Sequence, residues 1–158
     1  MDKNFAVNGT FGGVLPVLAQ NASTLTNFKT TNAISYKVDG NVFALAATAN
    51  ITPAMPATIT VPLVSTTSVG IYVSPAGTFS YTQGQTYLNT ALASTFAGTQ
   101  STAVYLTAGL PEEVPGKALL GYAIIQTTST GTFTGGTTNL NAANITTTYV
   151  DKGVYTGK

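Results

Sequence analysis

The clearest pattern in the sequence is the alternation of apolar and polar residues that is typical of half-buried β-strands. Ile34, Tyr36 and Val38 alternate with polar residues, and a second apolar run follows at residues 41–45. The dipeptide Asp39-Gly40 separates the two runs. A two-residue type I′ turn needs positive φ at both central positions, and Asp-Gly supplies this. The sequence therefore predicts a β-hairpin over residues 34–45.

Comparable runs predict further short strands along the chain. Residues 68–74 and 78–82 flank the segment Ser74-Pro75-Ala76-Gly77, which matches a type I turn with Pro second and Gly fourth. Prolines around residues 59–61 limit that stretch to a short edge strand. Residues 144–150 alternate in the same way. We expect each of these segments to be a strand.

Residues 117–128 predict the most buried strand, because they are apolar at positions facing both sides. Gly121 within this run indicates a bulge or a close approach of another backbone. Only residues 87–96 suggest a helix, since Leu88, Leu92 and Phe96 are spaced four apart and Gly98 follows. The pattern as a whole predicts an all-β fold: a β-sandwich or barrel of short antiparallel strands with at most one short helix.

The first 31 residues lack a regular period and are interrupted by glycines and Pro16. We interpret residues 1–31 as an extended N-terminal arm and residues 32–158 as the β-domain, so that removing the arm would leave a folded domain. A frayed terminus is the alternative. Apolar side chains are costly to leave in water, so we expect the arm to dock on a neighbouring subunit through these residues: Phe5, Phe11, Val14, Leu15, Val17 and Leu18.

Composition adds an unusual lack of charge. Only 7% of the residues are charged, the net charge is +1, and the chain contains no Arg. About a quarter of the residues in an average soluble domain are charged. A nearly neutral surface resists self-association poorly, which favours a protein whose faces are covered by neighbours. A neutral extracellular β-protein is the alternative.

The chain lacks the side chains that most enzymes use. It contains no His and no Cys, which excludes Ser-His-Asp and Cys-His nucleophiles and the usual zinc ligand sets. The acids are few, and Glu112 and Glu113 are adjacent, so in extended chain they point in opposite directions. We therefore predict no enzymatic activity and no cofactor. A calcium site at Glu112, Glu113 or Asp151 is a weaker interpretation than solvated loops.

Nucleic acid and membrane are also unfavoured partners. Six scattered Lys residues do not form the basic patch that nucleic-acid binding needs. No run of eighteen apolar residues occurs. The glycine-rich residues 131–138 lack the Gly-Lys-Ser/Thr ending of a phosphate-binding loop, and we interpret them as a flexible loop.

The aromatic residues of the predicted strands fit a core or an interface better than a sugar-stacking platform. The residues in question are Tyr36, Phe43, Phe79, Tyr81 and Tyr149. The start, Met1-Asp2-Lys3, is a poor secretory signal. We therefore expect synthesis in a cytoplasm.

Three segments together resemble small virion structural proteins of tailed bacteriophages. They are residues 34–40 (ISYKVDG), residues 110–125 (LPEEVPGKALLGYAII) and residues 133–151, which contain FTGGTTNL, ANIT and YVD. The resemblance implies a capsid decoration (cement) protein or a head-fibre component, commonly a homotrimer. It implies as partners further copies of the chain and the major capsid protein or other virion proteins, and as location the virion, after synthesis in the host cytoplasm. The alternative function is a fibre or adhesin module that binds host-surface glycan through exposed tyrosines such as Tyr87 or Tyr105.

Overall fold

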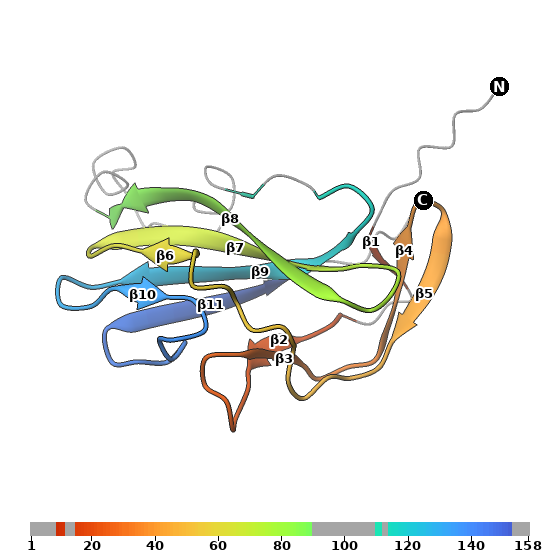
Figure 1. The fold of residues 1–158 in the computed structure, drawn as a ribbon, viewed down its shortest axis with the longest axis horizontal. Helices are drawn as coiled ribbons and strands as arrows, with labels where there is room; N and C mark the ends of the chain where they lie inside the picture. Colours follow the sequence, from red (N-terminus) through yellow and green to blue (C-terminus); the bar gives the residue numbers. More distant parts are fainter. Residues whose placement is uncertain (1–8, 12–14, 90–109, 112–113, 153–158) are drawn as a thin grey trace.

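The computed structural model describes residues 9–11, 15–89, 110–111 and 114–152, and these residues fold into antiparallel β-strands (Figure 1). The all-β prediction is confirmed. The strands are β1 (Gly9–Phe11), β2 (Leu18–Gln20), β3 (Phe28–Thr30), β4 (Ile34–Val38), β5 (Asn41–Leu45), β6 (Thr60–Val61), β7 (Ser65–Val73), β8 (Phe79–Leu88), β9 (Ala118–Thr127), β10 (Phe133–Thr134) and β11 (Ile145–Asp151).

The four longest strands form the main sheet, in the order β11-β9-β7-β8. They run side by side along the long axis of the molecule (Figure 1). Alternate residues of β7 face the hydrophobic core, namely Val69, Ile71 and Val73. Because successive side chains of a strand point to opposite faces, this row defines the core side of the sheet. The alternation predicted for residues 68–74 is thus confirmed.

Smaller sheets complete a sandwich-like fold. They are β1-β4-β5, β2-β3 and β10-β6, and the β4–β5 hairpin stands at one end of the main sheet (Figure 1). A single cluster of buried residues joins them to the main sheet, with members from β2, β3, β4, β6 and β10. One core therefore holds these described strands together.

Both predicted hairpins are present. Val38 pairs with Asn41, and Asp39 and Gly40 have φ values of 49° and 85°, as a type I′ turn requires. In the second hairpin the Gly77 amide donates to the Ser74 carbonyl at 2.9 Å. These turns were predictable because their backbone conformations depend on a few local residues.

Gly121 lies where two backbones come unusually close. A Cβ atom at this position would be 2.4 Å from the Val150 carbonyl oxygen and 2.7 Å from Leu18 Cδ1. The register between β7 and β9 also shifts between Ile71 and Tyr72, next to Gly121. The predicted bulge and the predicted close approach are therefore both found.

The predicted boundary at residue 31 is not a boundary of the fold. Residues 15–31 belong to the domain, since β2 pairs with β3, and Leu18 and Phe28 are buried in the core. The Leu18 amide also donates to Asp151 Oδ1 at 2.8 Å, which connects β2 to β11. The rest of the predicted arm, apart from β1, lies outside the described residues.

Two local predictions were wrong in part. Tyr87 and Leu88 end strand β8 and do not begin a helix, because their segment pairs with the start of β7, Leu88 opposite Ser65. Asn89, directly after the strand, is helical, and residues 90–96 of that predicted helix lie outside the described residues. The glycine-rich loop contains strand β10, whose Phe133 is fully buried and pairs with Val61. Burial of one aromatic side chain fixes this part of the loop.

The second face of the main sheet is also buried near its centre. Tyr72, Leu119 and Ile124 are at most 5% exposed and lie outside the main core cluster. A Cβ atom on Gly70, on the same face, would be 2.9 Å from Pro111 Cγ. Strands β7 and β9 are therefore interior strands, as their nearly continuous burial indicates.

Two valines adopt backbone conformations that suit glycine. Val17 and Val64 have φ values of 49° and 51°, and this region is unfavourable for β-branched residues. Because Val17 is also exposed, at 39%, the substitution Val17→Gly should remove strain at a small packing cost. We expect the free energy of unfolding to rise by about 0.5–1 kcal/mol, measured by chemical denaturation. The control Val42→Gly, within a strand, should lower it by a similar amount; a loss of stability in Val17→Gly would contradict the prediction.

No helix among the described residues has the length and apolar character needed to cross a membrane.

Candidate functional site

The most distinctive surface of the described residues is the outer edge of strand β5. Among the described strands, β5 is the last strand of the sheet β1-β4-β5 and pairs only with β4. It lies at the margin of the molecule (Figure 1). We call residues 41–47, which comprise β5 and the two alanines after it, the β5 edge.

The β5 edge is apolar, exposed and uncharged. Val42 is 68% exposed, the largest value among the exposed hydrophobic residues of the described chain. Ala44, Ala46 and Ala47 are also exposed. No charged residue occurs between Asp39 and Glu112 in the sequence. Natural proteins usually protect such edges with charges, Pro or bulges, because an open apolar edge pairs readily with another chain.

The register of the hairpin determines which backbone groups are open. In a two-residue hairpin the two residues that flank the turn, here Val38 and Asn41, exchange backbone hydrogen bonds. Hydrogen-bonded pairs then alternate with pairs that are not hydrogen-bonded, so the next bonded pair is Tyr36 with Phe43. The N–H and C=O groups of Val42 and Ala44 therefore point away from β4. Within the described part of the chain, no hydrogen bond joins these groups to another segment.

Tyr36 fixes the hairpin on the main sheet. Its ring contacts Phe43 of β5, with centroids 5.6 Å apart, and its hydroxyl donates to the Ser74 carbonyl at 2.8 Å. Burial raises the pKa of Tyr36 above its ordinary value, so this donor keeps its proton at neutral pH. The β5 edge is thus presented on a supported hairpin.

The two edges of the main sheet are better protected. At β8, the Gln83 side chain donates to the Thr60 carbonyl at 2.8 Å and accepts from the Thr60 amide at 3.3 Å, which connects β8 to β6. The register of β8 also shifts near Gln83. At β11, Asp151 binds the amide of Leu18. Within the described residues, no side chain binds the outward backbone groups of Val42 and Ala44 at the β5 edge.

The residues predicted to form an interface differ in their exposure. Leu15 and Val17 are exposed, at 38% and 39%. Leu18 is buried in the core and is not available to a neighbouring subunit; this prediction was wrong because β2 packs against β11. Phe5 and Val14 lie outside the described residues, as does the side chain of Phe11.

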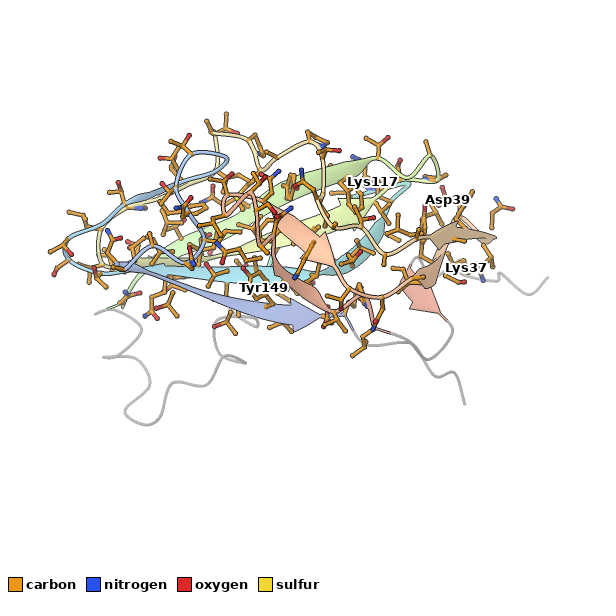
Figure 2. All side chains as sticks on the ribbon, turned by 90° about the horizontal axis from the view of Figure 1, so that it is seen from below. Lys37, Asp39, Lys117 and Tyr149 are labelled. Carbon is orange, nitrogen blue, oxygen red and sulfur yellow. The ribbon has the colours of Figure 1, made fainter. Side chains whose placement is uncertain are left out.

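The charged side chains of the described residues are few and form no cluster of potential metal ligands. Lys37, Asp39 and Lys117 lie at the hairpin end of the molecule (Figure 2), and Lys117 Nζ donates to Ser80 Oγ at 2.8 Å. No group of three or more potential metal ligands occurs in the described ranges. Glu112 and Glu113 lie outside them.

The aromatic residues of the strands are core residues, as predicted. Tyr36 and Phe79 are buried, and Phe43, Tyr81 and Tyr149 pack against the core. Tyr87 is half-buried, and its hydroxyl donates to Gln85 Oε1 at 2.6 Å. Tyr105 lies outside the described residues.

Tyr149 lies on β11 (Figure 2). We expect its hydroxyl to make the free energy of unfolding depend on pH in the alkaline range. Burial raises the pKa of Tyr149 to about 12, above its value of about 10 in the unfolded chain. The folded state therefore holds this proton more tightly. Its contribution is complete below pH 10 and is lost as the pH rises from about 10 to about 12. We expect Tyr149→Phe to reduce the loss of stability over this range, measured by denaturation at several pH values; an unchanged slope would contradict the assignment.

Two signals for the β5 edge were present in the sequence: the Asp-Gly turn, which placed the strand, and the uncharged stretch that follows it. The sequence pattern could not show that β5 is an outermost strand.

Comparisons with protein families, with curated proteins and with solved structures found no match to the chain.

Proposed function

We propose that this chain is a non-enzymatic structural protein that decorates a larger particle, of the capsid-decoration type. It acts by binding neighbouring protein surfaces, including further copies of itself. The observation that carries the proposal is the β5 edge, an exposed and uncharged strand edge with open backbone groups. Edges of this kind bind other chains by adding a strand.

The composition agrees with this role. A chain with 7% charged residues and a net charge of +1 has little electrostatic protection against association. Such a surface is suited to a protein that is covered by neighbours in its working state. The exposed Leu15 and Val17 offer a second apolar contact near the start of the domain.

The test starts from lysates of cells that express the gene and produce the particle that the chain is proposed to decorate. The particles are purified from these lysates on a density gradient. We expect the protein to migrate with the particles in a fixed ratio to the major shell protein. Particles stripped of it should lose heat resistance and regain it when purified protein is added. A protein that stays at the top of the gradient, and does not bind stripped particles, would contradict the proposal. Binding to a glycan array in place of particles would favour the adhesin alternative.

A further inference from the structure

We infer that the β5 edge binds the β5 edge of a second copy of this chain, in antiparallel orientation and centred on Phe43. The inference rests on the proposed function and specifies one partner for it. The product would be a continuous six-stranded sheet in the order β1-β4-β5-β5-β4-β1, formed around a two-fold axis.

The register follows from the open backbone groups. With Phe43 opposite Phe43 of the second copy, Val42 lies opposite Ala44 of the second copy, and the reverse pair is equivalent. Both pairs then exchange two hydrogen bonds, so that all the outward N–H and C=O groups of Val42 and Ala44 are satisfied.

The chain after β5 opposes a longer overlap. A register centred on Ala44 would also require the backbone groups of Ala46. The Ala46 carbonyl already accepts a hydrogen bond from Thr48 Oγ1 at 3.0 Å. Thr48 is in turn bound to Thr30, which draws the chain away from the hairpin. The register centred on Phe43 avoids this conflict.

The position of Asp39 favours the antiparallel orientation. Asp39 lies two positions before β5. Parallel pairing would place the two Asp39 carboxylates at the same end. Antiparallel pairing separates the Asp39 positions by eight strand residues, about 27 Å at 3.4 Å per residue, beyond the ~8 Å screening length of physiological salt. The edge itself carries no charge that would select a charged partner.

The pairing should be weak in dilute solution. Two five-residue strands cover much less than the roughly 800 Å² per partner that stable complexes bury. Association therefore depends on concentration, and it is favoured where copies are already held close together on a surface.

Sedimentation equilibrium of the full chain, from about 10 μM to about 1 mM, tests the association. We expect the average mass to rise from 16.2 kDa towards twice that value. Val42→Lys should weaken association by at least about tenfold, because it places a charged side chain at the paired edge, opposite Ala44 of the second copy and two residues from the second introduced charge. Thr148→Lys introduces the same charge at an exposed site on β11 and should leave association unchanged. Circular dichroism will show that both variants remain folded.

Disulfide trapping tests the register, because the chain contains no Cys. A mixture of Val42→Cys and Ala44→Cys should give cross-linked dimers on mild oxidation, since directly opposed residues lie within disulfide reach. Either variant alone should cross-link much less, since its two cysteines would be offset by two residues.

The outcomes separate this inference from the proposed function. A chain that remains monomeric at 1 mM, a rise in mass towards three copies, equal cross-linking in all samples, or an unchanged Val42→Lys variant would overturn the two-fold pairing. If particle binding is retained in any of these cases, the proposed function stands without it.

Discussion

Replacing Phe28 by Ala should lower the free energy of unfolding by about 4 kcal/mol. The Phe28 side chain is fully buried. Its ring lies 5.9 Å from that of Tyr81 and 6.1 Å from that of Tyr149, measured between centroids. The smaller side chain would leave a cavity between β3 and the main sheet and remove both aromatic contacts. Chemical denaturation followed by circular dichroism measures the change.

This substitution also tests where the domain begins. If residues 1–31 were a detachable arm, Phe28→Ala would have almost no effect on stability. Val42→Ala is the matched control, because it shortens an exposed side chain and should change the stability by less than about 0.5 kcal/mol. Equal effects of the two substitutions would show that β3 does not belong to the core.

Replacing Gly121 by Ala should lower the free energy of unfolding by about 3 kcal/mol. The added Cβ atom would meet the Val150 carbonyl oxygen at 2.4 Å and the Asp151 Cα atom at 3.0 Å. Both atoms belong to the backbone of β11, so relief requires β9 and β11 to separate. The pairing of Asp151 with Gly121 would be strained most. The measurement is again equilibrium denaturation.

Gly9→Ala is the control for this effect. Gly9 also lies in a strand, but no heavy atom is within 4 Å of the position that its Cβ atom would occupy. We expect a change of less than about 0.5 kcal/mol. If Gly121→Ala is equally mild, the two strands are not packed as closely as described.

The parts of the fold that sequence predicted well depend on neighbouring residues. The turn at Asp39-Gly40 and the turn ending at Gly77 both require positive φ, and the residue types alone indicate this. The long strand at residues 118–127 was predictable because an interior strand is apolar at positions on both faces. The close approach at Gly121 was predictable because a glycine inside a strand often marks a bulge or a neighbouring backbone.

The parts that sequence did not predict depend on distant contacts. Strands β2 and β10 have three and two residues, too few for a period to be visible. Leu18 is held by Asp151, 133 residues away in the chain, and Phe133 is held by Val61. Such pairings come from the tertiary structure, so the division at residue 31 and the flexible-loop interpretation could not have been corrected from local pattern.

The candidate site was predictable only in its chemistry. Sequence indicated a strand at residues 41–45 and a lack of charge, but the position of β5 at the outside of its sheet follows from the partners that β4 takes on its two sides. Of the residues predicted to form an interface at the N-terminus, Leu15 and Val17 are exposed, and the prediction was wrong for Leu18, which is buried.

The uncharged stretch between Asp39 and Glu112 has a consequence for the conditions that the protein tolerates. Strands β5, β6, β7 and β8 all lie within it, so contacts among them involve no ion pair that dissolved salt could weaken. Their backbone and apolar contacts should persist from fresh water to brine and across the acidic range in which carboxylates gain protons. In the proposed role as a decoration protein, the chain would therefore stay folded when the salt concentration or the acidity around the particle changes.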